Sequence, residues 1–149
     1  MKIKLIFFGK KRKNNLDEIT MGYFKRIQKE INSEIIFISD QNKILPNSFK
    51  ENDLVILIDE KGKHFDSISF SKKFKMLIQN SKKKIIFIVG DANGFSSEIY
   101  NRSNEIISLS KFTFTHEIAR LVIVEQIYRA ITIIKNHPYH NEWINFSNS

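Results

Sequence analysis

Two imidazoles and one phenol surround a single proline in the segment 136–140, which reads NHPYH. An imidazole exchanges protons near neutral pH, and a phenol can donate a hydrogen bond or stack on a flat ring. Metal binding is not expected, because zinc takes three or four ligands, and the chain has no cysteine and four histidines: His64, His116, His137 and His140. The segment is therefore either ordinary surface or a catalytic lid.

A carboxylate and a guanidinium lie one turn apart within the apolar segment 117–135. Glu125 precedes Arg129 by four residues, which is the better order for an ion pair on a helix. On an apolar helix such charges must pair with each other or face a polar site. Position alone favours structural pairing, and Arg120 carries the same two interpretations.

Three stretches place polar and glycine residues directly after apolar runs: LIDEKGK (57–63), FIVGDANGFSSEI (87–99) and SLSKFTFTHE (108–117). Ligands of open α/β sheets bind outside the carboxyl ends of the strands, so these stretches are candidate binding loops. The second has no phosphate-loop spacing, and Gly94 is expected in a turn that needs positive φ. Ser110 and His116 are close in sequence but lack a nucleophile elbow, which excludes a hydrolase triad.

The elements that must position these loops are short strands and amphipathic helices. Runs rich in Ile, Val and Phe are predicted to be strands over 3–9, 34–39, 53–59, 84–90 and 105–110. The third is expected to end at Ile58 and Asp59, with a turn at Gly62. The third and fourth show little alternation, which is typical of central parallel strands covered on both faces.

Helical periodicity fills the segments between the strands. A helix over 16–31 is predicted to bury one stripe, which consists of Leu16, Ile19, Tyr23, Ile27 and Ile31. Asp66 and Ser67 can cap a second helix, and Ser96 and Ser97 can open a short third one. The apolar face of the second holds Phe70, Phe74, Leu77 and Ile78. The last helix, 117–135, is apolar around most of its circumference, which suggests a subunit interface in so small a protein.

The order of elements predicts an α/β fold with a mainly parallel sheet, helices on both faces and a single domain over 1–149. The formal charge of +8 favours an anionic partner such as RNA, although a Lys- and Asn-rich composition raises the charge without any binding site. Basic residues cluster at 10–13 and 82–84. No segment approaches the roughly 18 apolar residues of a membrane span, so a cytoplasmic protein without a membrane partner is expected.

Four motifs occur in the order and spacing of one bacterial family: VGDANGF, SLSKFTFTHEIAR, VIVEQIYRA and NHPYH. The chain resembles the ribosomal RNA large subunit methyltransferase H family, of the SPOUT class, over essentially its whole length. The last third carries the most specific part of the resemblance. The resemblance implies a homodimer with a deep trefoil knot near the C-terminus, which binds S-adenosyl-L-methionine. It also implies methylation of N3 of a pseudouridine in 23S ribosomal RNA, with the assembled ribosome as substrate.

The resemblance also assigns site residues, position by position. The implied cofactor-binding residues are Ile58, Gly90, Leu109, Ser110, Lys111, Phe112, Thr113 and Phe114. The implied catalytic residues are Glu125, Arg129, Tyr139 and His140, and no metal is implied. His140 or water would accept the N3 proton, Arg129 would stabilise the developing anion, and Tyr139 would stack on or orient the base. The tail would reach the pocket from the same subunit or from the partner.

Two positions depart from the family pattern. Asp91 stands where a second glycine is common, and Thr115 stands where proline is usual, although a threonine there can cap the following helix. Asp91 could meet the cofactor or point into solvent. Two other functions are open: a non-catalytic RNA- or ribosome-binding protein of the same fold, and a flavodoxin-like domain for a phosphorylated cofactor.

Overall fold

The computed structural model describes residues 1–11, 13–44, 46–80 and 84–140, so Arg12, Lys82 and Lys83 of the two basic clusters lie outside the described residues. Its strands are β1 (Lys2–Phe8), β2 (Ser33–Ile38), β3 (Leu54–His64), β4 (Lys84–Val89) and β5 (Glu105–Ser108). They form one sheet in the order β2-β1-β4-β3-β5, and every neighbouring pair is parallel. The predicted α/β fold with a parallel sheet is confirmed.

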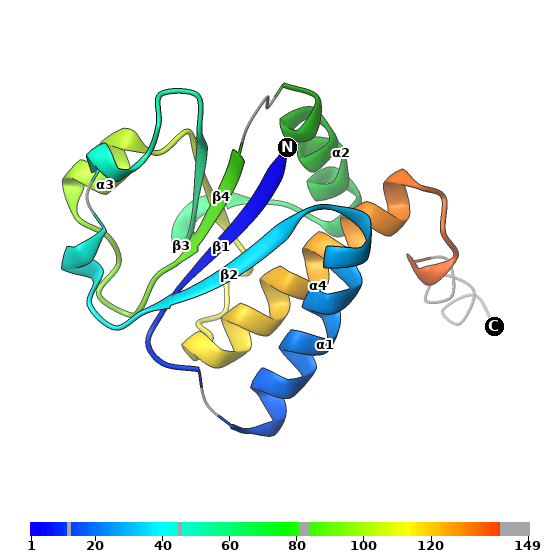
Figure 1. Ribbon diagram of the computed structural model, residues 1–149, viewed down its shortest axis with the longest axis horizontal. Helices are drawn as coiled ribbons and strands as arrows, with labels where there is room; N and C mark the ends of the chain where they lie inside the picture. The colour runs from blue at the N-terminus through cyan, green and yellow to red at the C-terminus, as the bar shows by residue number, and fades with distance from the viewer. Residues whose placement is uncertain (12, 45, 81–83, 141–149) are drawn as a thin grey trace.

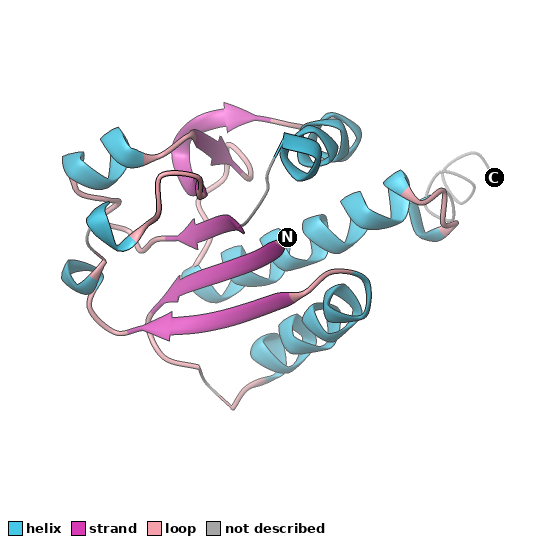
Figure 2. Ribbon diagram, turned by 45° about the horizontal axis from the view of Figure 1, so that its top comes forward, coloured by secondary structure: helices cyan, strands magenta, loops and turns pink. Residues whose placement is uncertain are grey.

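Helices cover both faces of the sheet (Figures 1 and 2). The α-helices are α1 (Asn15–Glu30), α2 (Ser67–Asn80), α3 (Ser97–Arg102) and α4 (His116–Ile134), and two 3-10 turns are η1 (Gln41–Lys43) and η2 (Pro46–Ser48). The larger core lies between the sheet and α1, α2 and α4, whereas α3 and the 3-10 turns cover part of the other face. The trefoil knot implied by the resemblance stays a prediction.

The first helix buries Ile27 as predicted, and Tyr23 and Ile31 pack against the core, but Ile19 does not belong to the buried stripe. Its buried residues are Asp17, Thr20, Phe24 and Ile27, whereas Ile19 is 49% exposed. The helix also buries a polar residue, because the carboxylate of Asp17 lies 3.8 Å from the guanidinium of Arg120 on α4. Hydrophobic periodicity alone cannot predict a buried ion pair.

Arg120 has a structural role, which resolves its two interpretations. The side chain is 1% exposed and donates a 2.5 Å hydrogen bond to the carbonyl of Phe8 at the end of β1. Its guanidinium also lies over the rings of Phe7 and Phe37, at 5.6 and 5.1 Å. These contacts hold the N-terminal part of α4 against the carboxyl end of β1.

The third strand is longer than predicted and continues to His64. It pairs with β5 in two registers, because both Ile58 and Lys63 lie opposite Ile107, with an irregularity between them. Gly62 therefore does not form the expected turn. A Cβ on Gly62 would lie 2.6 Å from the backbone nitrogen of Ile107, so the two backbones meet at a distance that only glycine permits.

The apolar circumference of α4 is explained within one chain. The helix packs on the sheet and contacts both α1 and α2, and Ile123, Val124 and Ile127 are fully buried. Burial on three sides thus accounts for the apolar sequence of α4. The subunit interface that this sequence suggested stays a prediction. Within the described residues, no helix combines the length and the apolar character needed to cross a membrane.

Candidate active site

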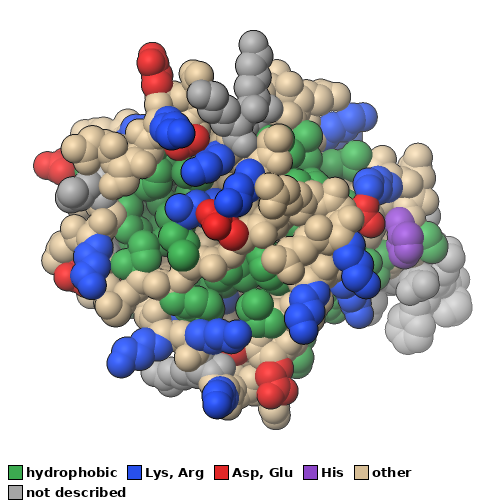
Figure 3. Space-filling model, in the orientation of Figure 1, with side chains coloured by type: hydrophobic (Ala, Val, Ile, Leu, Met, Phe, Trp, Pro, Cys, Tyr) green, Lys and Arg blue, Asp and Glu red, His purple; other side chains and the backbone are tan. Residues whose placement is uncertain are grey.

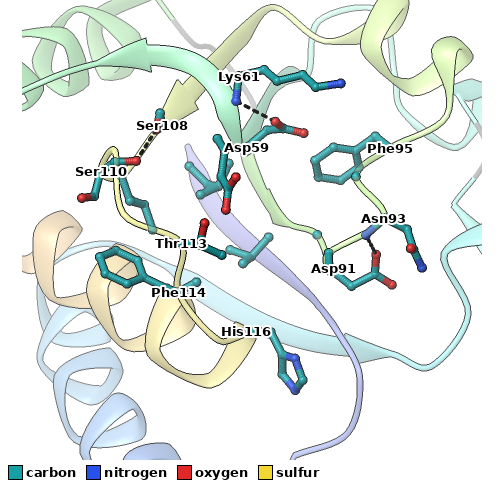
Figure 4. A pocket seen from close by; sticks show the side chains of 18 of the residues that line it. Asp59, Lys61, Asp91, Asn93, Phe95, Ser108, Ser110, Thr113, Phe114 and His116 are labelled. Carbon is teal, nitrogen blue, oxygen red and sulfur yellow. Dashed lines mark hydrogen bonds between the residues drawn. The ribbon is translucent and has the colours of Figure 1, made fainter.

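A pocket of about 570 Å³ lies where the carboxyl ends of β4 and β5 meet the irregular middle part of β3 (Figure 4). Its walls are residues 58–61 of β3, residues 89–95 from the end of β4 onward, Tyr100 of α3, and the loop after β5 with the first turn of α4. Ligand pockets in proteins commonly measure about 300–1,000 Å³, so this one can hold a molecule of nucleoside size. The three candidate loops of the sequence therefore converge on one site.

Most residues with an implied cofactor role line this pocket. The lining includes Ile58, Gly90, Leu109, Ser110, Phe112, Thr113 and Phe114. Lys111 differs from them, because it is exposed and does not belong to the lining. The pocket wall therefore contains every residue with an implied cofactor role except Lys111.

Short-range hydrogen bonds hold the loop after β5 in shape. The Ser108 hydroxyl donates to the carbonyl of Ser110 at 2.9 Å, and the Ser110 hydroxyl accepts from the amide of Phe112 at 3.0 Å. Thr115 caps α4, because its hydroxyl accepts from the amide of Ile118 at 3.4 Å. The capping role expected of Thr115 is confirmed, so the helix begins normally without the proline usual in the family.

Asp91 shapes the loop after β4. Its carboxylate accepts a 2.9 Å hydrogen bond from the amide of Asn93, and its carbonyl accepts from the amide of Gly94 at 3.1 Å. Gly94 has φ of +70°, which confirms the turn expected there. The carboxylate that departs from the family pattern is thus engaged in a local turn at the rim of the pocket (Figure 4).

Sequence reasoning missed the polar pair of Asp59 and Tyr100 on the pocket wall. The Tyr100 hydroxyl of α3 donates to the Asp59 carboxylate at the bend of β3. Burial, and then the hydrogen bond to Asp59, raise the pKa of Tyr100 above its ordinary value. The Phe95 ring packs edge-on against Tyr100 and Phe8, with centroids 5.7 and 5.8 Å apart. No spacing signal exists for contacts between residues so far apart in the chain.

The four residues with implied catalytic roles form a second cluster of their own. Glu125 accepts from Nε of Arg129 at 3.0 Å and lies 2.7 Å from its Nη2, so the predicted ion pair is confirmed. The Tyr139 hydroxyl donates to the same Glu125 oxygen at 2.9 Å. Nη1 of Arg129 lies 3.1 Å from Nδ1 of His140. The NHPYH segment is thus held against α4 by charged hydrogen bonds.

Aromatic residues of α1 and α4 complete this cluster. The ring of Tyr139 packs edge-on against Tyr128, with centroids 5.0 Å apart, and the Arg129 guanidinium lies 4.7 Å from its centre. The hydroxyls of Tyr139 and Tyr23 are 3.3 Å apart, and Arg26 lies over the ring of Tyr23. Burial, followed by the contacts with Tyr23 and Glu125, raises the pKa of Tyr139 well above its ordinary value.

The raised pKa predicts how the protein responds to alkaline pH. In the folded chain Tyr139 keeps its proton above about pH 10, where an unfolded tyrosine loses it. Its contribution to stability is therefore complete below about pH 10 and is lost as pH rises further. Tyr139→Phe should flatten the alkaline fall in unfolding free energy, measured by urea denaturation. The tyrosinate absorbance of parent and variant should differ only at strongly alkaline pH, because the phenol that the variant lacks ionises there. If the variant instead lacked a phenol that ionises near pH 10, the assignment would be contradicted.

The pocket and this cluster lie at different ends of α4. Ala119 in its first turns lines the pocket, and Arg129 comes ten residues later, about 15 Å along the helix axis. Figure 1 shows α4 running from the loop after β5 to the C-terminal segment at the far end. None of Glu125, Arg129, Tyr139 and His140 belongs to the lining residues. Within one described chain, the cluster therefore does not reach the pocket.

The charges around the pocket favour a cationic ligand. Asp59, Glu60 and Asp91 contribute carboxylates, whereas Lys61 is the one lysine among the lining residues. A phosphorylated ligand would meet this excess of negative charge, which argues against the flavodoxin-like alternative. Among the described residues, no group of three or more His, Asp or Glu side chains could hold a metal ion.

Comparisons with known proteins agree with this architecture. The family model described as "Predicted SPOUT methyltransferase" matches residues 1–140. Proteins named "Ribosomal RNA large subunit methyltransferase H" include one from Christiangramia forsetii, 38% identical over 95% of this chain and 99% of its own length. Another, from Parabacteroides distasonis, is 36% identical over 95% of this chain and all of its own length.

A more distant likeness is to a solved methyltransferase structure from Legionella pneumophila with bound S-adenosylmethionine. Its TM-score is 0.44 at 12% identity, over 88% of this chain and 66% of that one, which is too low to support an inference. The family model and the full-length relatives are sufficient without it. The chain belongs to the SPOUT methyltransferase family and, within it, to the ribosomal RNA large subunit methyltransferase H family.

Proposed function

We propose that this chain is an S-adenosyl-L-methionine-dependent methyltransferase that acts on N3 of a pseudouridine in 23S ribosomal RNA, with the assembled ribosome as substrate. The observation that carries the proposal is the convergence of the irregular part of β3 and the loops after β4 and β5 on one pocket of about 570 Å³. The names of the full-length relatives support ribosomal RNA as the substrate class. The net charge of +8 suits an RNA partner.

The residues of the pocket fit this methyl donor. S-adenosylmethionine is a net cation with a flat adenine ring, and when bound it supplies an activated methyl group on a sulfonium. Ile58, Leu109 and Phe114 offer apolar wall for the ring. The carboxylates of Asp59 and Asp91 would complement the positive charges. Gly90, which has no side chain, leaves space in front of Phe95 at the end of β4.

The RNA-facing chemistry belongs to the cluster of Glu125, Arg129, Tyr139 and His140. Glu125 orients the Arg129 guanidinium, whose charge can stabilise an anion that develops on the base. In one chain this cluster does not line the pocket. We therefore include a homodimer in the proposal, in which the cluster of one subunit faces the pocket of the other. Exposed apolar side chains near the pocket, Phe112 and Ile118, offer surface for such pairing.

Basic side chains are spread over the face seen in Figure 3 rather than gathered in one patch. Some are partly neutralised, since Lys2 lies 3.1 Å and Lys4 3.9 Å from the Glu34 carboxylate. Overall charge, rather than one lysine cluster, thus supports an anionic partner.

Transfer of a labelled methyl group tests the proposal. The protein would be given the methyl donor with ribosomes, with separated subunits or with free 23S RNA from cells that lack the protein. We expect label in the ribosomal RNA of assembled ribosomes, and nucleoside mass mapping should locate it on a pseudouridine. Ribosome binding without transfer would instead support the non-catalytic RNA-binding alternative.

A further inference from the structure

We infer that His140 acts in this site as a hydrogen-bond donor, through Nε2–H, and not as the base that accepts the N3 proton. The inference rests on the proposed function for its substrate, but its structural basis is independent of the substrate. One imidazole nitrogen of His140 already has a hydrogen-bond partner in the protein alone.

The Arg129 guanidinium occupies Nδ1 of His140. Nη1 of Arg129 lies 3.1 Å from this nitrogen. A guanidinium has only donors and keeps its charge, so Nδ1 must be the acceptor in this hydrogen bond. The arginine cannot easily turn away, because Nε and Nη2 are held by Glu125 at 3.0 and 2.7 Å. The ion pair thus aims one donor at the imidazole.

An acceptor at Nδ1 determines the state of the other nitrogen. A neutral imidazole has one N–H, so the proton lies on Nε2, which then has no lone pair for a second proton. A proton on Nδ1 would point the Nδ1–H of His140 at the Nη1–H of Arg129, and an imidazolium would lie beside the guanidinium charge. The nearby carboxylate offers little relief, because Oε1 of Glu125 accepts from Arg129 and Tyr139 and Oε2 accepts from Gln126 at 2.8 Å.

Tyr139 is not an alternative base. Its hydroxyl already donates to Glu125 at 2.9 Å and lies 3.3 Å from Tyr23. Among the described residues of this cluster, the charged and titratable groups are the Arg129 and Arg26 guanidiniums, the Glu125 carboxylate, the His137 imidazole and the phenols of Tyr23, Tyr128 and Tyr139. The Arg129 guanidinium is the group that contacts the imidazole, at Nδ1.

A donor at this position suits the chemistry of the base. When the N3 proton leaves to solvent, its electron pair stays on N3 and negative charge spreads to the two flanking carbonyl oxygens. The Nε2–H of His140 and the Arg129 guanidinium can both stabilise an oxygen of that anion. His140 then assists the loss of the proton without receiving it, and Arg129 and Glu125 act on it as positioning residues.

Nitrogen-15 NMR of the imidazole tests the inference without RNA or methyl donor. In the parent protein, neutral His140 should show the Nε2–H tautomer with Nδ1 as an acceptor. Arg129→Gln should give a mixture of tautomers, because the obligatory donor is gone. A parent spectrum dominated by the Nδ1–H tautomer would overturn the proposal, whatever the activity of the protein.

Two substitutions then separate a donor from a base during turnover. Glutamine places an N–H near the position of Nε2 but cannot act as a base, whereas alanine offers neither. His140→Gln should stay within about tenfold of the parent methylation rate, and His140→Ala should fall about 10²–10³-fold. Equal losses of about 10²–10⁴ in both variants would identify a base and overturn the inference. If the parent itself transfers no methyl group, the proposed function fails, while the NMR result still stands.

Discussion

Two variants that are inactive on their own are expected to regain about a quarter of the parent activity when their subunits are mixed. The first, Gly90→Val, fills the pocket, because a Cβ at this position already comes within 2.9 Å of the Phe95 ring. That ring is held by Phe8 and Tyr100 and has little room to retreat. The second, Arg129→Ala, removes the cation that joins Glu125 to His140.

The expected recovery follows from where the two halves of the site lie. If the pocket of one subunit works with the cluster of the other, a mixed dimer has one intact site and one doubly defective site. Random exchange makes about half of the dimers mixed, so about one quarter of all sites are intact. If each chain instead used its own cluster, every site would carry one defect and mixing would restore nothing.

A crossed control uses the same substitutions in one chain. The double variant Gly90→Val, Arg129→Ala, mixed equally with the parent, should leave about one quarter of the activity if sites are shared between subunits. It should leave about one half if each chain works alone. Activity is measured as methyl transfer to ribosomes, after subunit exchange has been verified with two affinity tags. The opposite pattern in the two mixtures would contradict the shared site.

The pocket could be predicted from sequence because it depends on topology. Parallel strands bring their carboxyl ends to one edge of a sheet, so the stretches after Val89 and Ser108 had to be neighbours once the strands were recognised. The stretch after Ile58 joins them although β3 continues to His64, because the strand is irregular at that point. The cap at Thr115 and the positive φ of Gly94 were also predictable, since both follow from local backbone chemistry.

Features that depend on contacts between distant segments could not be predicted. Asp17 of α1 is buried beside Arg120 of α4, and no periodicity within α1 predicts that contact or the exposure of Ile19. Tyr100 and Asp59 meet across the pocket wall although they come from different elements. The extension of β3 to His64 depends on a second register with β5. The polar sequence DEKGK has no strand pattern from which this extension could be predicted.

The sequence predicts only part of the cluster of Glu125, Arg129, Tyr139 and His140. The spacing of Glu125 and Arg129 predicts their ion pair, because residues four apart share one face of a helix. Nothing local predicts that Tyr23 of α1 lies 3.3 Å from the hydroxyl of Tyr139. The separation of this cluster from the pocket depends on the position of the tail, which becomes known only when the chain is folded.

Gly62→Ala is expected to lower the unfolding free energy by about 3 kcal/mol, at the upper end of what overpacking usually costs. The added Cβ would lie 2.6 Å from backbone atoms of Ile106 and Ile107, which cannot move aside as a side chain can. The backbone of Gly62 has no positive φ, so the effect is steric. β3 and β5 must therefore separate. This movement reaches the pocket, because Ser108 at the end of β5 and Leu109 after it line the pocket. Affinity for S-adenosylmethionine should therefore fall at least about tenfold, equal to about 1.4 kcal/mol.

The matched control is Gly22→Ala, on the exposed side of α1, where an added Cβ would meet no atom within 4 Å. Replacing a glycine inside a helix by alanine should raise the unfolding free energy by about 0.5–1 kcal/mol. Urea denaturation of both variants then compares the effect of the same methyl group on the unfolding free energy at two positions. Calorimetric titration with S-adenosylmethionine measures the affinity of the pocket. If Gly62→Ala matched the parent in both measurements, β3 and β5 could not approach each other as closely as we describe, and the wall that β5 extends into the pocket would not depend on that glycine.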